Sequence, residues 1–344
     1  MEATRRLADD VLGPTAEATD QGATVPASHV EALAAAGLFG LVGPVSHGGA
    51  DAPLAVRREI YEMLAGACGV TFFVWTQHHS PVRMLAGSPN AVLRERYLAD
   101  LCAGRLLGGV AFAYLRRPGS PAVAARTVPG GYRVVGEAPW VSSWGSAGVY
   151  TVAARCDGRI VWFSLTPEAG KESVRASEPL RLAAMNASST VRLAFDDLFV
   201  PDDDVMSVED VADWHSRDRV ATAQPQPGVF GLAATACRLL RELDDDAGAA
   251  LEQELAGCRH RSYELADAAQ PDEEHLEALV EARAWSLDVA VRSAAALVSA
   301  SGGRAMDRGH PAQRLLREAA FFSIQAQTAA VRKATLARLQ PRRS

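Results

Sequence analysis

Long apolar runs are missing from this 344-residue sequence, and no stretch is long enough to span a bilayer. The opening residues, MEATRRLADD, lack the apolar core of a signal peptide. The 5 cysteines show no paired metal-ligand spacing, and their odd number suits a reducing compartment. A formal net charge of -6 argues against nucleic acid as a main partner. These absences favour a cytoplasmic protein without a membrane span.

Common catalytic signatures are also absent. The sequence has no Gly-x-Ser-x-Gly run, no phosphate-binding loop and no zinc signature. What remains is an ordinary globular composition, with 48% hydrophobic and 22% charged residues. The length allows two or three layers and more than one core.

The pattern of residue types changes twice along the chain. Ala/Leu-rich segments near the start predict helices at His29–Leu38, Leu54–Ala67 and Ala91–Ala103. From about Leu107 to Pro201, β-branched and aromatic residues alternate with polar ones, which predicts antiparallel strands. Helical composition then returns. The sequence therefore predicts an α+β fold with an N-terminal helical domain (1–107), a central antiparallel β-domain (108–203) and a C-terminal helical bundle (204–344).

Two long helices are predicted near the C-terminus. One covers Glu273–Ser301, and the other runs from Pro311 to Leu339. Pro311 suits the first turn of a helix, where a missing N–H costs little. Apolar and small residues then recur at spacings of four and three, at Leu316, Ala320, Ile324, Thr328, Val331 and Thr335.

The stretch 130–155 reads as two strands with a connection that contains Trp140 and Ser142. A large flat ring two residues before a hydroxyl suits a planar conjugated ligand, because the indole covers a face and the hydroxyl meets a polar edge. The alternative is that Trp140 is ordinary core and the serine belongs to a turn.

Five motifs occur in an order that resembles the acyl-CoA dehydrogenase family, a flavoprotein superfamily that also includes two-component flavin monooxygenases. They span nearly the whole chain: VPASHVEALAAAGLFGLVGPVSHGGADAPL (25–54), AGACGVTFFVWTQHH (65–79), GGYRVVGEAPWVSSWGSAG (130–148), FDDLFVP (195–201) and SGGRAMDRGHPAQRLLREA (301–319). Each motif is moderately specific, and the order of all five is strongly specific for the fold. Fold alone does not settle function.

The resemblance implies three-domain subunits that form a dimer or tetramer, with FAD between the β-domain and the C-terminal bundle. It places Ala113, Leu115 and Arg116 on the strand that lines the flavin ring, and Trp140 and Ser142 against that ring. It also places Ser120 near the acyl thioester, Gly302 and Gly303 near the adenosine half of FAD across a subunit interface, and Thr328 near the flavin. Glycines let a backbone approach a ligand closely, and the cofactor carries the redox chemistry.

The sequence departs from the family pattern at the catalytic base. Desaturating an acyl thioester needs a carboxylate that takes the α-proton, while the β-hydrogen leaves as hydride to the flavin. The family often has an aromatic-Glu-Gly-Thr run here, but the matching residues are Gln325–Thr328, with Ala326 in place of the glutamate. Some relatives place the base earlier, and Asp218 stands in that zone. Its other interpretation is a helix cap that pairs with an adjacent arginine.

Three further segments raise alternatives. Arg241–Gly248 has acidic residues where the family meets the cofactor's pyrophosphate, and carboxylates repel phosphate unless they are paired or solvated. Arg117 either binds an acidic substrate group or is simply exposed. His78 and His79 could shuttle protons, but the more common arrangement is one buried, hydrogen-bonded imidazole and one exposed imidazole.

Three functions fit these observations. The first is an FAD-dependent acyl-CoA dehydrogenase-like oxidoreductase, acting on an acyl-CoA or a carrier-bound acyl thioester and passing electrons to a flavoprotein or to oxygen. The second is a two-component flavin-dependent monooxygenase, which needs no α-proton base, although 321–331 lacks the histidine common in that branch. The third is a partner subunit without a base, in a mixed rather than homo-oligomeric assembly. The resemblance favours the first.

Overall fold

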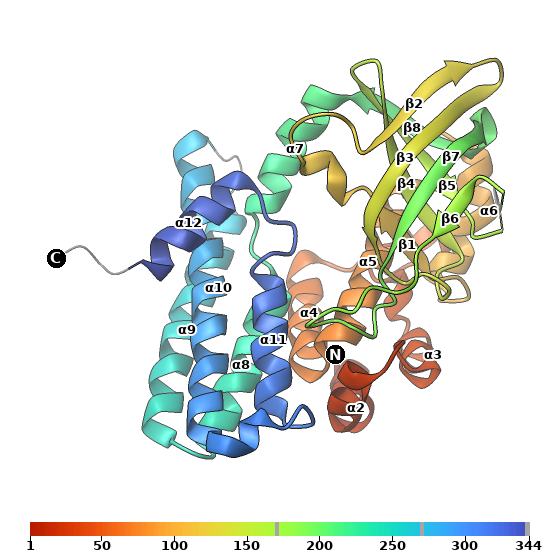
Figure 1. Ribbon diagram of the computed structural model, residues 1–344. Helices are drawn as coiled ribbons and strands as arrows, with labels where there is room; N and C mark the ends of the chain where they lie inside the picture. The colour runs from red at the N-terminus through yellow and green to blue at the C-terminus, as the bar shows by residue number, and fades with distance from the viewer. Residues whose placement is uncertain (169–171, 269–271, 341–344) are drawn as a thin grey trace.

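Helices at both ends of the chain flank one β-sheet in the computed structural model, which describes residues 1–168, 172–268 and 272–340 (Figure 1). The predicted α+β class is confirmed. The N-terminal helices are α1 (Glu2–Arg6), the π-helix η1 (Leu7–Leu12), η2 (Gly13–Thr15), α2 (Ala16–Gln21), α3 (Ala27–Ala35), η3 (Leu38–Gly40), η4 (Val45–His47), α4 (Leu54–Ala67), α5 (Gly69–Ala86) and α6 (Ala91–Cys102).

The sheet follows in the order β6-β7-β3-β2-β4-β5-β8, with β1 added beside β4. Its strands are β1 (Gly108–Ala111), β2 (Val123–Val128), β3 (Gly131–Val141), β4 (Val149–Cys156), β5 (Arg159–Leu165), β6 (Val174–Ala176), β7 (Val191–Pro201) and β8 (Val205–Asp210). The sequence predicts antiparallel pairing, and most pairs are antiparallel. However, β1 and β2 both run parallel to β4, so the sheet is mixed. Two short 3₁₀ helices, η5 (Ala113–Arg116) and η6 (Asp202–Asp204), interrupt the strands.

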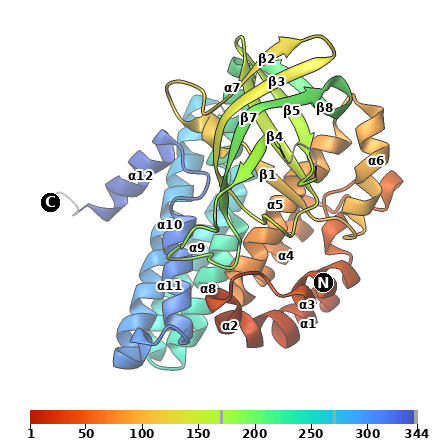
Figure 2. The same cartoon turned by 45° about the vertical axis from the view of Figure 1, so that its right-hand side comes forward.

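A helical bundle completes the fold, and Figures 1 and 2 show α8, α9, α10 and α11 running side by side. Its elements are α7 (Val211–Ala223), α8 (Pro227–Arg241), α9 (Asp245–Ala266), α10 (Glu273–Ser301), η7 (Gly302–Met306), α11 (Pro311–Phe322) and α12 (Ala329–Leu339). The predicted helices Leu54–Ala67 and Glu273–Ser301 match α4 and α10. Within the described residues, every helix is too short or too polar to cross a bilayer.

The predicted single helix from Pro311 to Leu339 is wrong, because the chain breaks between α11 and α12. Ala326 has a φ of 49°, a left-handed conformation that a helix cannot contain and that costs alanine about 1 kcal/mol. Thr328 then begins α12, because its Oγ1 accepts a hydrogen bond from the N–H of Val331 at 3.3 Å. The break therefore falls on the segment where the family pattern has its glutamate.

Both histidines of α5 are buried, so the prediction of one exposed imidazole is wrong. His78 Nδ1 accepts from the N–H of Gly108 at 2.9 Å, which leaves Nε2 to donate to the carbonyl of Phe39 at 3.2 Å. His79 Nδ1 lies 2.8 Å from the hydroxyl of Tyr61. The neutral ring of His78 thus ties α5 to the start of β1 and to η3, and burial lowers its pKa to about 4.

The buried His78 gives a prediction for acid stability. The unfolded chain binds a proton on this ring near pH 6.5, whereas the folded protein binds it only near pH 4. The free energy of unfolding should therefore fall as the pH drops from 6.5 to 4, by on the order of 3 kcal/mol from His78. In urea denaturation at several pH values, the free energy of unfolding of His78→Gln should change less with pH than that of the wild type. The pH dependence that remains in this variant belongs to His79. The exposed control His215→Gln should keep the wild-type slope, and an unchanged slope in His78→Gln would contradict this assignment.

Close contact between α4 and α8 depends on Gly231. A Cβ at this position would lie 1.9 Å from the carbonyl oxygen of Glu62. Gly231→Ala should therefore force the two helices apart and lower the free energy of unfolding by about 1–3 kcal/mol. The matched control is Gly257→Ala on α9, where a Cβ meets no atom within 4 Å. That change should raise the free energy of unfolding by up to about 1 kcal/mol. If Gly231→Ala and Gly257→Ala change it equally in urea denaturation, the close packing at Gly231 is ruled out.

Candidate functional site

Trp140 lies near the end of β3, at an irregularity in the pairing with β7 between Ala138 and Val141. Its φ is 62°, and its side chain is 51% exposed. The interpretation of Trp140 as ordinary core is therefore wrong. A tryptophan held in a strained backbone conformation with its ring uncovered is typical of a ligand-binding position. It lines a cavity of about 410 Å³, here named the Trp140 cavity, together with Arg117, Ala122, Glu137, Pro139 and Arg192.

The residues after Trp140 enter a buried hydroxyl network. Ser142 Oγ lies 2.8 Å from Thr190 Oγ1, which in turn lies 2.7 Å from Ser188 Oγ. Ser143 has a φ of 64°, and its buried hydroxyl has no partner among the described residues. The backbone of Ser143 is held on both sides, because its N–H donates to Ser188 and its carbonyl accepts from the Tyr150 hydroxyl. An uncovered indole therefore stands close in sequence to an orphaned hydroxyl.

The 3₁₀ helix η5 carries three of the predicted cofactor residues, where the resemblance implies a strand. Ala113 is exposed, Leu115 is buried and Arg116 is half-buried. The hydroxyl of Tyr114 reaches the carbonyls of Ala111 and Ala153, which holds η5 against the sheet. The helix η5 ends at Arg116, and the next residue, Arg117, lines the Trp140 cavity.

Asp218 lies within α7 and binds Arg116, 102 residues earlier in the chain. Arg116 Nε donates to Asp218 Oδ2 at 2.8 Å, and Nη2 donates to Oδ1 at 2.7 Å. Asp218 is therefore neither a helix cap nor the partner of an adjacent arginine, because Arg217 pairs with Glu209 and Arg219 with Glu273. This bidentate pair places the candidate base against Arg116, the last residue of η5.

Arg283 of α10 is a buried cation that the sequence analysis did not select. Its guanidinium donates to the carbonyls of Thr222, Gln325 at 2.8 Å and Ala326 at 3.4 Å. Within the described residues it has no carboxylate partner within ion-pair distance, and its Nε has no hydrogen-bond partner. Burial, with a smaller contribution from Arg116, lowers the pKa of Arg283 to about 10, so it remains charged at neutral pH. The sequence does contain a feature that could have identified this residue, because Arg283 interrupts the apolar stripe of α10.

The remaining predicted residues lie apart from this cluster. Ser120 is exposed in the segment after η5, and Thr328 caps α12. Gly302 and Gly303 are in η7, between α10 and α11, and Figure 1 places this connection at the end of the bundle away from the sheet. Gly302 has a φ of 62°, and a Cβ on either glycine would meet no atom within 4 Å. The single chain therefore does not bring these glycines to Trp140.

The acidic segment after α8 is paired. Arg241 Nε donates to Asp245 at 2.9 Å, and its Nη1 donates to Glu252 at 2.8 Å. Asp244 caps α9 by accepting from the N–H of Ala247. The resemblance implies that Arg241 contacts the pyrophosphate of the cofactor. Its guanidinium is instead paired with carboxylates of this chain.

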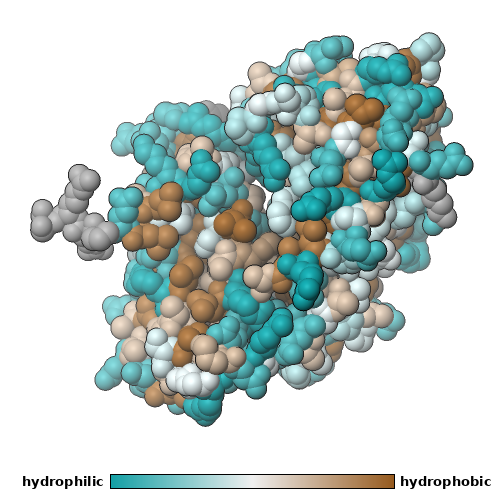
Figure 3. Space-filling model, viewed as in Figure 1, coloured by the Kyte–Doolittle hydropathy of each residue, from teal (hydrophilic) through white to brown (hydrophobic). Residues whose placement is uncertain are grey.

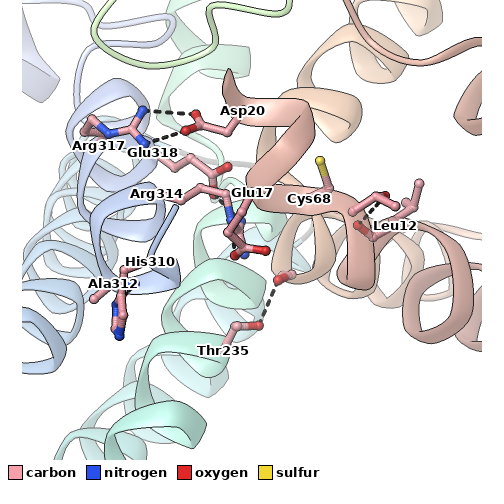
Figure 4. Close-up of polar contacts among 12 residues, drawn as sticks. Leu12, Glu17, Asp20, Cys68, Thr235, His310, Ala312, Arg314, Arg317 and Glu318 are labelled. Carbon is pink, nitrogen blue, oxygen red and sulfur yellow. Dashed lines mark hydrogen bonds and ion pairs between the residues drawn. The ribbon is translucent and has the colours of Figure 1, made fainter. Parts of the chain in front are cut away.

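A second buried charged cluster joins α2 to α11 (Figure 4). Arg314 donates to Glu17 at 3.1 Å and to Glu318 at 3.0 Å, and Arg317 binds Asp20. Glu318 is fully buried, which raises its pKa, and its carboxyl group packs against Gly69. Arg314 also lines a second cavity of about 560 Å³ between the N-terminal helices, α4, α8 and α11. Among the described residues, no group of histidine, cysteine and acidic side chains could hold a metal ion.

Known proteins resemble both the sequence and the fold. The family "Acyl-CoA dehydrogenase, N-terminal domain" matches residues 1–105. Benzylmalonyl-CoA dehydrogenase of Aromatoleum aromaticum is 25% identical over 97% of this chain and 94% of its own length. The oxygenase component of an FADH(2)-dependent resorcinol hydroxylase from a Rhizobium species is 25% identical over 90% of this chain and 86% of its own.

Solved structures share the fold over almost the full length. Butyryl-CoA dehydrogenase from Megasphaera elsdenii superposes with a TM-score of 0.81 and 18% identity, covering 98% of this chain and 96% of that one. PigA with FAD and proline has a TM-score of 0.83 and 18% identity, covering 98% and 95%. Residues 1–105 match the family "Acyl-CoA dehydrogenase, N-terminal domain", and the whole chain has the fold of the acyl-CoA dehydrogenases.

Arg283 should fix the segment between α11 and α12. Arg283→Met removes one donor from each of three carbonyl groups, and among the described residues only that of Gln325 keeps a second side-chain donor, Gln226, so the free energy of unfolding should fall by about 1–3 kcal/mol. Amide hydrogen exchange in residues 323–328 should speed up. Arg292→Met is the control on the same helix, because its guanidinium pairs with Glu254 and Asp288 instead of with residues 323–328. Unchanged exchange in Arg283→Met would show that this arginine does not hold the segment.

Proposed function

We propose that this chain is an FAD-dependent oxidoreductase that desaturates an acyl thioester between its α- and β-carbons, with Asp218 as the base. The observation that carries the proposal is that a carboxylate, Asp218, binds Arg116, and that the next residue, Arg117, lines the Trp140 cavity. The relatives support a thioester substrate, because several of them are named as acyl-CoA dehydrogenases.

The residues present fit the ring end of FAD. The uncovered indole of Trp140 offers a flat apolar face, and the orphaned Ser143 hydroxyl offers a polar partner. Arg117 and Arg192 line the same cavity, and Nε of Arg192 lies 4.0 Å from Oε1 of Glu137. When bound, FAD supplies the oxidant that takes a hydride from the substrate. Ala113, Leu115, Arg116 and Ser142 would hold the ring end together with Trp140.

The adenosine end needs a second subunit under this proposal. Gly302 and Gly303 leave open space for a close backbone approach, but they lie at the far end of the bundle. A dimer or tetramer would bring them to a partner's cofactor. An apolar surface supports assembly: Figure 3 shows hydrophobic side chains gathered over the bundle, and Ile324, Leu336 and Leu339 are more than half exposed.

Asp218 would take the α-proton of the thioester as a general base. To do so it must leave the two hydrogen bonds from Arg116, which neutralise its charge in the described state. Ser120 and Thr328 would then lie near the thioester and the flavin, respectively. Ala326 leaves the usual position of the base without a carboxylate, so Asp218 is the residue that this mechanism requires.

An oxygenase is the second candidate, because the resorcinol hydroxylase component is as similar in sequence as the dehydrogenase. The closed Arg116–Asp218 pair also favours it, since oxygen chemistry on a reduced flavin needs no α-proton base. A partner subunit without its own activity is the remaining alternative, supported by Ala326 and by the neutralised Arg241.

The test is an absorption spectrum of the purified protein, followed by anaerobic addition of acyl-CoA substrates. We expect bound oxidised flavin on an oligomer and bleaching by the substrate. Asp218→Asn should keep the flavin but bleach about 10²- to 10⁴-fold more slowly, whereas the exposed control Asp213→Asn on the same helix should behave as wild type. Asp218→Glu should recover part of the rate if the carboxylate is the base.

Other outcomes point to the alternatives. A flavin-loaded protein that no acyl-CoA bleaches would contradict the dehydrogenase proposal. Hydroxylated product with supplied reduced flavin would establish the oxygenase. A colourless protein that gains flavin only with a second family member would establish the partner subunit.

A further inference from the structure

The ion pair between Arg116 and Asp218 prevents Asp218 from acting as a base while it is closed. Both carboxylate oxygens accept charge-assisted bonds, at 2.7 and 2.8 Å. A proton arriving on Asp218 would leave the guanidinium facing a neutral acid. Proton transfer is therefore opposed unless Arg116 finds another anion.

Arg283 strengthens this opposition. It is 2% exposed and lacks a carboxylate partner among the described residues, and burial and, to a smaller extent, Arg116 lower its pKa. Opening the pair between Arg116 and Asp218 would thus leave a second unpaired guanidinium within electrostatic range of a buried cation.

The pair can be reached by a ligand without unfolding. The side chain of Arg116 is 20% exposed and that of Asp218 is 12% exposed, whereas Arg283 is buried. Arg116 also adjoins Arg117, which lines the Trp140 cavity with Arg192 and the single carboxylate Glu137. Because Arg192 pairs with Glu137 at 4.0 Å, Arg117 gives the cavity lining one net positive charge.

We propose that the substrate is an acyl thioester that carries a second carboxylate, and that this carboxylate takes Arg116 away from Asp218. The inference rests on the proposed function and names its substrate class. A carboxylated substrate gives Arg116 a new ion-pair partner in place of Asp218, so only the carboxylate of Asp218 is left free. A neutral acyl chain would have to break the pair without replacing it. The substrate's own charge would thus release the base only after the substrate is bound.

Binding can be measured without turnover by using coenzyme A thioethers, which lack the carbonyl that acidifies the α-proton. The matched probes are S-(3-carboxypropyl)-CoA and S-butyl-CoA, titrated calorimetrically into the FAD-loaded protein. We expect the carboxylated probe to bind at least about tenfold more tightly. Arg116→Gln should abolish that preference. Arg219→Gln, which removes an exposed arginine beside Asp218, should retain it.

The second measurement is anaerobic flavin bleaching by succinyl-CoA and butyryl-CoA. Wild type should bleach faster with succinyl-CoA. Arg116→Gln should bleach faster than wild type with butyryl-CoA, because Asp218 is no longer bound, and should lose the advantage of succinyl-CoA. Arg116→Lys serves as a second variant if the glutamine protein does not fold, since it keeps the charge but loses the bidentate geometry.

The outcomes separate this inference from the proposed function. Equal binding of the two thioethers by wild type, or a preference that survives in Arg116→Gln, would overturn the inference. If butyryl-CoA still bleaches the flavin in that case, the proposed dehydrogenase function holds and only the inference about the second carboxylate fails. A clear thioether preference without bleaching by any acyl-CoA would support carboxylate docking and reject the dehydrogenase. A fall in FAD affinity in Arg116→Gln with unchanged thioether binding would assign Arg116 to the cofactor's phosphates and overturn the inference.

Discussion

The ion pair between Arg116 and Asp218 is the contact on which this site depends. It joins η5, which is anchored on the sheet, to α7, which leads into the helical bundle. It also determines the chemistry of the site, because a carboxylate held by both oxygens is a structural anion until the pair opens. One interaction therefore joins two parts of the fold and holds both carboxylate oxygens of the residue that we propose as the base.

Arg283 explains how the chain replaces the segment in which the family usually has its glutamate. The break between α11 and α12 has no carboxylate, and its carbonyls at Gln325 and Ala326 serve instead as acceptors for this guanidinium. The segment thus neutralises part of a buried cation through backbone dipoles, which costs less than leaving that cation without any partner. The alanine at position 326 and the buried Arg283 are in this way parts of the same arrangement.

Much of the fold could be predicted from the sequence, because periodicity and composition act locally. Leu54–Ala67 and Glu273–Ser301 have helical spacing without internal breakers, and both form as predicted. The segment Pro311–Leu339 has the same spacing but breaks, since a left-handed Ala326 is stabilised by Arg283 from another helix. No local pattern records such a long-range hydrogen bond.

The site was less predictable for the same reason. The resemblance selected Asp218 and Arg116 for separate roles, and only the three-dimensional arrangement shows that they bind one another. From its residue type alone, Trp140 could be either a ligand contact or part of the core. Its exposure accompanies an irregularity in the pairing of β3, which the sequence does not reveal. His78 and His79 could not be distinguished in sequence, because the carbonyl and amide that bury His78 come from distant segments.

The most direct test of the central claim is a crystal structure of the protein with FAD bound. The account predicts that the isoalloxazine ring contacts the indole of Trp140 and lies on the side of η5 that faces Asp218. Density for FAD at another place, or a Trp140 cavity left empty at saturating FAD, would contradict it.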